Sequence, residues 1–273
     1  MDKKPNWKPT KAEYWQYLPA PARPWPSEVA WFEKYALKKK EEGLKDVLIL
    51  GSTVEFRAML HKHKMNVHVV DFSKEFYETL SRQKMKFRRE EVFYEQNWVT
   101  MDLGKKFDLI FGDWVPGVLY TKDYDKFYIN IIKHLNNKGL FIGRECLRPN
   151  KNPVDLEKVA KEHYKKYASR YSFYETSAQY AYGFSPDPVT SMWNITKAQK
   201  ALDDVYKKNL MEKDDFDFMT KALSFESDGS MSIMVKEDFE KEIKKYFNIF
   251  TVHHVEEPSS DWFPIYVLQK KGN

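Results

Sequence analysis

Small or polar residues stand directly after four stretches of the chain that have the pattern of β-strands. They are Gly51, Asp71, Asn97 and Asp113. If the strands are parallel, their carboxyl ends meet at one edge of a sheet, where α/β proteins bind ligands. A glycine lets the backbone approach a ligand closely, and a carboxylate 20 residues later can accept hydrogen bonds from both hydroxyls of a ribose. This spacing predicts a nucleotide-type site.

The pattern that would position these residues is an alternation of strands and helices. DVLILG and NVHVVD are each followed by a helical stretch, and FDLIFGD and LFIGRE come later with a helix between them. Near the end of the chain, the helix KEDFEKEIKKYF precedes the two strands NIFTVHHVEE and FPIYVLQKK. Such alternation predicts an α/β fold with helices on both faces of the sheet. We expect a Rossmann-like, doubly wound, mostly parallel seven-stranded sheet whose last strand is antiparallel.

The chain divides into three parts. Residues 1–43 are an arm rich in Trp, Tyr and Pro followed by a helix, and we expect Ser27 to cap that helix. The arm is either a lid over the site or a strap packed on the sheet edge. Residues 44–147 and 231–273 form the predicted core. Residues 148–230, which are Lys-rich around an aromatic segment, form a helical insertion after the fifth strand that would cover the site.

Charge and cysteine content restrict the class of protein. Basic residues exceed acidic ones by 45 to 40, but most lysines alternate with carboxylates, which is typical of a solvated surface. The run Lys84 to Arg89 could contact nucleic acid, although no RNA-binding module surrounds it. The single Cys146 cannot form an internal disulfide. With no predicted signal peptide or membrane span, we expect a cytoplasmic protein without a membrane partner.

The ordered motifs resemble those of a known family. VLILGSTVEFRAML, VHVVDFS, QNWVTMDL, FDLIFGDWVPGVL and YDKFYINIIKHLNNKGLFIGRECLRP are similar, one after another, to the motifs of class I S-adenosylmethionine-dependent methyltransferases. The first motif is most similar to a subgroup that reads Leu-Gly-x-Thr-Pro-Glu-Leu in place of a glycine string. The resemblance covers about residues 20 to 149, and the final helix and strands continue the same core order. It implies S-adenosyl-L-methionine as cofactor and S-adenosyl-L-homocysteine as product.

The resemblance also assigns roles around the cofactor. It places Gly51 beside the methionyl part, Asp71 at the ribose, Phe72 against adenine, Asn97 near the adenine amine and Trp98 as a ring wall. Because GSTVEF lacks the later glycines of G-x-G-x-G, the loop must contact the cofactor through a different backbone geometry. The predicted cofactor-binding residues are Gly51, Ser52, Thr53, Glu55, Asp71, Phe72, Asn97, Trp98, Asp113 and Trp114.

Methyl transfer is an in-line displacement, so proximity and orientation supply most of the acceleration. A general base contributes only if the acceptor must lose a proton. We expect Asp113 to be the catalytic residue, with Tyr124 as a second candidate. For Tyr124 and Tyr128 the alternative is core packing, and for Arg144 it is an internal ion pair. The residues predicted to bind the acceptor are Tyr17, Arg23, Tyr120, Tyr128, Arg144, Tyr180 and Tyr182.

Three functions stay open at this stage. A small-molecule acceptor is favoured, because an insertion after the fifth strand can enclose one. An RNA or protein methyltransferase is the second hypothesis, and an inactive cofactor-binding scaffold is the third. NAD binding is disfavoured, since the loop lacks G-x-G-x-x-G. We predict no metal site, because His253 and His254 would point to opposite faces of a strand. The sequence predicts no oligomeric state.

Overall fold

The computed structural model describes residues 14–15, 17–84, 90–152, 154–177, 193–226 and 231–272. Its centre is one sheet of seven strands in the order β3-β2-β1-β4-β5-β7-β6. The strands are β1 (Asp46–Leu50), β2 (Asn66–Asp71), β3 (Val92–Glu95), β4 (Phe107–Asp113), β5 (Leu135–Arg144), β6 (Phe247–His253) and β7 (Ile265–Lys270). Strand β7 is antiparallel to both β5 and β6, and all other neighbouring pairs of this described sheet are parallel. The predicted fold class is confirmed.

Strand register brings the carboxyl ends together. Leu50 of β1 lies between Val70 of β2 and Gly112 of β4. Asp113 pairs with Arg144 at the ends of β4 and β5. The residues that follow β1, β2 and β4 therefore share one edge of the sheet, as the sequence predicts.

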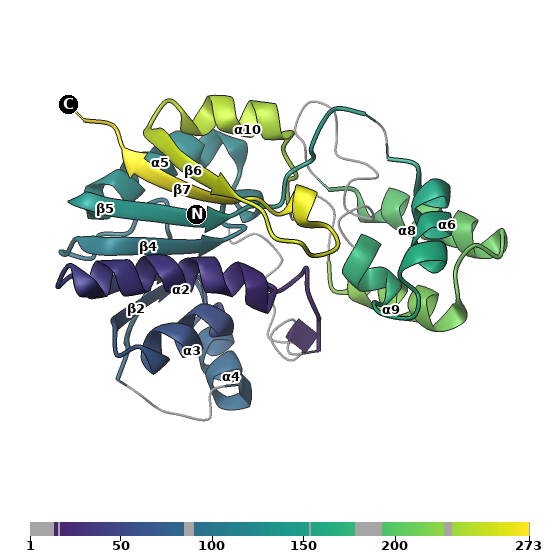
Figure 1. The fold of residues 1–273 in the computed structure, drawn as a ribbon, viewed down its shortest axis with the longest axis horizontal. Coiled ribbons are helices and arrows are strands. Elements are labelled where there is room, and N and C mark those ends of the chain that lie inside the picture. The colour runs from purple at the N-terminus through teal and green to yellow at the C-terminus, as the bar shows by residue number, and fades with distance from the viewer. Residues whose placement is uncertain are drawn as a thin grey trace.

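Helices cover both faces of the sheet (Figure 1). On one face lie α2 (Pro26–Glu41), α3 (Val54–Lys62) and α4 (Lys74–Lys84). On the other lie α5 (Tyr124–His134) and α10 (Lys236–Ile243). Alternate residues of each strand feed the two apolar layers, so Phe111 packs with the α2 and α3 side chains while Phe141 packs with those of α5 and α10. Short 3₁₀ turns, η1 (Pro116–Val118), η2 (Thr121–Asp123) and η3 (Ser260–Trp262), join these layers.

The insertion stands beside the sheet and has a core of its own (Figure 1). Its helices include α6 (Leu156–Lys166), α8 (Ile195–Lys207) and α9 (Lys213–Ser224). Two residues of the N-terminal arm, Tyr14 and Leu18, are buried in this core. The rings of Tyr14 and Phe225 stack with centroids 3.9 Å apart. The arm and the insertion thus pack as one body.

The expected helix cap was wrong. Helix α2 begins at Pro26, one residue before Ser27, and the backbone N–H of Trp25 donates to the Glu28 carboxylate at 2.7 Å. The Ser27 hydroxyl instead donates to Glu257 at 2.9 Å. Strand β5 begins at Leu135, and the segment NNKG within it is an irregularity in the pairing with β4, between the pairs Phe107–Leu135 and Leu109–Leu140. None of the described helices is both long and apolar enough to cross a bilayer.

Candidate active site

Gly51 leaves β1 with a φ of +91°, a conformation that side chains with a Cβ rarely adopt. Its N–H donates to the Val70 carbonyl at 2.8 Å, and the same carbonyl accepts the Trp98 indole N–H at 2.8 Å. The Trp98 ring lies 3.6 Å from the place that a Gly51 Cβ would occupy. The Val70 carbonyl of β2 therefore joins the loop after β1 to the turn after β3, and Gly51 itself contributes no side chain to this junction.

Asp71 ends β2 with its side chain fully buried. Its Oδ2 accepts the Ser52 hydroxyl at 2.5 Å, and its Oδ1 accepts the Ser73 backbone N–H at 3.3 Å. Ser52 belongs to the loop that follows Gly51, so one hydrogen bond joins the first two strand ends. Burial raises the pKa of Asp71 to about 6, although these donors act in the opposite direction.

Two of the predicted cofactor-binding residues form an aromatic wall beside Asp71. The rings of Phe72 and Trp98 lie 5.0 Å apart and are tilted by 53°. Asn97 turns its side-chain oxygen toward its own backbone and accepts the Val99 N–H at 2.9 Å. It thereby orders the turn that carries Trp98, whose carbonyl accepts the Asn130 amide at 3.0 Å.

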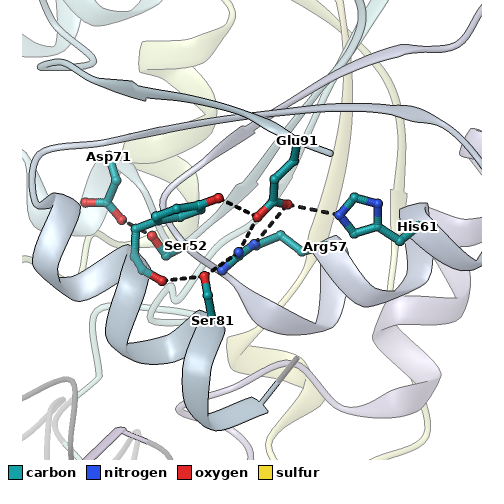
Figure 2. Close-up of polar contacts among 7 residues, drawn as sticks. Ser52, Arg57, His61, Asp71, Ser81 and Glu91 are labelled. Atoms are coloured by element: carbon teal, nitrogen blue, oxygen red, sulfur yellow. Dashed lines mark hydrogen bonds and ion pairs between the residues drawn. The ribbon is translucent and has the colours of Figure 1, made fainter. Parts of the chain in front are cut away.

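A buried polar network near Asp71 joins α3 and α4 to Glu91, the residue that directly precedes β3 (Figure 2). The Arg57 guanidinium pairs with Glu91 and donates to Ser81 at 2.6 Å. Glu91 also contacts His61 at 3.0 Å and accepts the Tyr77 hydroxyl at 2.6 Å. Sequence reasoning missed this network, because its members are far apart in the chain and no motif marks them.

Asp113 is not a free carboxylate. It accepts a hydrogen bond from the Arg144 guanidinium at 2.7 Å, and Glu28 of α2 lies 2.7 Å from the same guanidinium. A third Arg144 nitrogen donates to the Pro21 carbonyl in the arm at 2.7 Å. Burial raises the pKa of Asp113 to about 6, although Arg144 lowers it. For Arg144, the internal ion pair that the sequence left open is present.

The arm also reaches the loop after β1. Arg23 donates to Glu55 with its Nε at 2.6 Å, and Glu55 stands in the first turn of α3 just after its N-cap, Thr53. Trp15 packs edge-on against Phe76 of α4, with ring centroids 6.5 Å apart. The arm therefore crosses from the insertion to the ends of β1, β2 and β5. Arg23 and Glu55, which the sequence assigns to acceptor and cofactor, bind each other.

The predicted tyrosines fall into two groups. Tyr124 and Tyr128 are buried, and the Tyr124 hydroxyl donates to the Pro116 carbonyl at 3.0 Å. Burial raises the pKa of Tyr124 to about 12. Tyr17 and Tyr120 lie at the surface, 69% and 38% exposed. Tyr180 and Tyr182 lie outside the described residues, as does most of the run Lys84 to Arg89.

Trp114 marks the place where the core meets the insertion. It has a φ of +52°, and its indole occupies the space that a Gly117 side chain would need. Its ring meets Trp193 and Phe263 edge-on, with centroids 6.3 and 6.5 Å away. These rings form an aromatic corner next to Asp113. In the described ranges, no group of three or more His, Cys, Asp or Glu side chains is placed to hold a metal ion.

Comparison with known proteins defines the fold of this chain but assigns the chain to no sequence family. No family model and no curated protein matches the chain. The CcbJ methyltransferase of Streptomyces caelestis matches with a TM-score of 0.60 at 12% identity over 100% of both chains. The Bradyrhizobium japonicum N-methyltransferase NodS, solved with S-adenosylhomocysteine, matches with a TM-score of 0.51 at 10% identity over 96% of this chain and 99% of that one.

A Rhodobacter sphaeroides structure also matches, with a TM-score of 0.60 at 13% identity over 98% of both chains, and it is provisionally named a zinc-dependent alcohol dehydrogenase. Identities this low show the fold alone. The chain has the Rossmann-like fold that these methyltransferases share. Membership of the subgroup whose first motif reads Leu-Gly-x-Thr-Pro-Glu-Leu stays a prediction.

Proposed function

We propose that this chain is an S-adenosylmethionine-dependent methyltransferase that acts on a small molecule in the cytoplasm. The observation that carries the proposal is the joined strand ends, where side-chain-free Gly51 adjoins the buried carboxyl of Asp71 and the ring of Phe72. A site for S-adenosylmethionine needs a carboxylate for the ribose and an apolar surface for adenine. Asp71 and Phe72 have that chemistry, and the fold is one on which such methyltransferases are built.

In this proposal the residues bind and orient. Asp71 accepts the ribose hydroxyls, Phe72 and Trp98 flank adenine, and the Gly51 backbone adjoins the methionyl part. The bound cofactor supplies a methyl group on a sulfonium centre. Because Asp71 is buried, a ribose reaches it only after a covering segment moves. We propose that the arm is this lid, since it spans the ends of β1, β2 and β5.

The two catalytic candidates receive different roles. Asp113 already accepts a hydrogen bond from Arg144, so we assign it to orienting cofactor or acceptor at the β4 end rather than to proton abstraction. The Tyr124 hydroxyl is engaged with a backbone carbonyl inside the core, so we assign it to holding α5 against η1. Arg144 fastens the arm to the site through Pro21.

A small acceptor is supported by what surrounds the carboxyl edge. The arm and the insertion share a core, and the corner formed by Trp114, Trp193 and Phe263 adjoins Asp113. Such aromatic surroundings suit a small molecule. The single Cys146 is free and buried, which favours a reducing compartment.

Calorimetric titration with S-adenosylmethionine and S-adenosylhomocysteine tests the proposal. We expect the wild type to bind both and Asp71→Asn to bind at least tenfold more weakly, because one charge-assisted hydrogen bond contributes about 1.5–3 kcal/mol. Asp102→Asn is the matched control, since its carboxylate is exposed and pairs only with Lys133 among the ion pairs of the described residues. No binding by the wild type would overturn the enzyme proposal, and equal binding by Asp71→Asn would remove the ribose assignment.

A further inference from the structure

Glu145 directly follows β5, next to the end of β4. Strand alternation puts it on the same face as Phe141 and Gly143, which is the face covered by α5 and α10. Its Oε1 lies 2.5 Å from the point that a Gly143 Cβ would occupy, so the glycine makes room for the carboxyl. Arg144, one residue earlier, points to the opposite face and toward α2.

The Glu145 side chain is buried, with the residue 2% exposed. Among the described residues its carboxyl makes no hydrogen bond and no ion pair. The adjacent Arg144 guanidinium lies on the opposite face, where it contacts Glu28, Asp113 and Pro21. A buried carboxylate without a partner is costly. Burial, and after it the charge of Asp113, raises the pKa of Glu145 well above its usual range.

A second polar group without a partner lies on the same face. The Tyr128 hydroxyl is fully buried, and it has no hydrogen-bond partner in the described part of the chain. Tyr128 belongs to the apolar layer that contains Phe141, which is the layer on the face of the sheet where Glu145 lies. Aromatic rings flank Tyr128: those of Tyr124 and Tyr246 lie 6.1 and 5.3 Å away, measured between ring centroids.

We propose that Glu145 and Tyr128 form the polar inner end of the acceptor site and that the group they take is a basic amine. An ammonium supplies the positive charge that a buried carboxylate lacks, whereas a neutral hydroxyl does not. Electron-rich ring faces also favour a cation. This inference rests on the proposed function and deepens it by naming the class of acceptor.

The proton balance is simple. In the empty site Glu145 holds a proton, which it releases to solvent when an ammonium binds and donates an N–H to the carboxylate. The bound ammonium must then lose one proton to expose its nitrogen lone pair. Glu145 accepts that proton and becomes neutral again, and the amine becomes neutral too. Tyr128 keeps its proton throughout and orients the nitrogen by a hydrogen bond.

Infrared difference spectroscopy of the full chain, saturated with S-adenosylhomocysteine at pH 7, tests this. The spectrum of wild type minus Glu145→Gln should contain the carbonyl band of a protonated carboxyl, and Glu162→Gln, which removes an exposed carboxyl beside Lys158, should leave that band unchanged. The probes are methylamine and benzylamine, with methanol and benzyl alcohol as neutral partners of the same shape. At least one amine should abolish the band, and neither alcohol should.

A band that is missing in the wild type, or that persists with both amines, would overturn the inference, as would alcohols acting as the amines do. Tyr128→Phe gives a second measure, because it keeps the packed ring and removes only the hydroxyl. We expect it to weaken amine binding about tenfold, the equivalent of one hydrogen bond; unchanged binding would remove Tyr128 from the site. Failure to bind S-adenosylhomocysteine would instead count against the proposed function, and calorimetry on the same sample separates the two results.

Discussion

At the scale of single residues, the proposed cofactor site depends on one backbone conformation and one buried carboxyl. Gly51 has a positive φ, and Asp71 is joined to it through Ser52. The glycine and the carboxylate were predictable, because their residue types and their places after strands carry the signal. The Ser52–Asp71 bond and the pairing of Asp113 with Arg144 were not, because they depend on side-chain directions that no spacing encodes.

Gly51→Ala should separate the effect of backbone strain on stability from the effect on cofactor binding. A Cβ at this φ costs about 1–2 kcal/mol of unfolding free energy, while its contact with Trp98 at 3.6 Å is an ordinary one. Gly104→Ala is the control: its φ is +61°, and a Cβ there would meet nothing within 4 Å. Denaturant unfolding should show similar losses for both variants, but only Gly51→Ala should weaken S-adenosylhomocysteine binding. Equal affinity in the two variants would contradict the site.

Binding should also depend on pH through Asp71. Its pKa is raised to about 6, so the group is ionised and accepts ribose hydroxyls above that pH and is protonated below it. Affinity for S-adenosylhomocysteine should be constant from about pH 7 to 8 and fall by up to tenfold per unit below about pH 6. Because the pKa of Asp113 is also about 6, Asp71→Asn is needed to isolate the effect. If Asp71→Asn loses affinity for S-adenosylhomocysteine in acid just as the wild type does, a group other than Asp71 causes that loss.

At the scale of elements, periodicity predicted the strands and helices well, and it failed where tertiary contacts decide a boundary. Ser27 has the chemistry of an N-cap, but Glu28 captures the Trp25 N–H and frees Ser27 to reach Glu257. NNKG has turn composition, and it interrupts the pairing of β5 with β4, but the pair Phe107–Leu135 before it extends the strand back to Leu135. The link between α3 and α4 through Glu91 was invisible, because Arg57 lies 34 residues away.

Acid should loosen that link. Burial acts to raise the pKa of Glu91, but hydrogen bonds from His61 and Arg57 outweigh it and lower the pKa to about 2. A carboxyl whose pKa is lower in the folded state contributes stability above its unfolded value near 4.5, and this stability is lost as the pH falls toward about 2. Unfolding free energy should therefore decline over this range.

Denaturant titrations at a series of pH values would measure the decline. Glu91→Gln should be less stable at neutral pH, because it leaves the buried Arg57 charge without a counter-charge, and its acid slope should be shallower. Glu78→Gln, an exposed carboxyl on α4, should behave as the wild type does. If the unfolding free energy falls with pH at the same rate in all three proteins, Glu91 does not cause the decline.

At the scale of the whole molecule, the arm and the insertion form one body beside the sheet (Figure 1). The sequence predicted an arm, a core and a helical insertion, and it left open whether the arm was a lid or a strap. What it could not predict is that Tyr14 and Leu18 lie among the insertion's apolar side chains. Contacts between segments about two hundred residues apart leave no local pattern.

Tyr14→Ala should loosen the insertion without unfolding the sheet. Removing a buried ring that stacks on Phe225 costs about 3 kcal/mol, so amide exchange in α9 should accelerate while exchange in β1 and β4 stays slow. Tyr17→Ala is the control, since that ring is 69% exposed and only three residues away. Exchange rising equally in the sheet would show that the arm, insertion and core unfold as one unit.

A crystal structure with S-adenosylhomocysteine would test the proposed cofactor site. We predict ribose hydroxyls within hydrogen-bonding distance of the Asp71 carboxylate, adenine against Phe72, and the homocysteine part over the Gly51 backbone. The arm should have moved relative to Glu55 or closed over the ligand. A ligand bound elsewhere, or at this edge without contact to Asp71, would contradict the account.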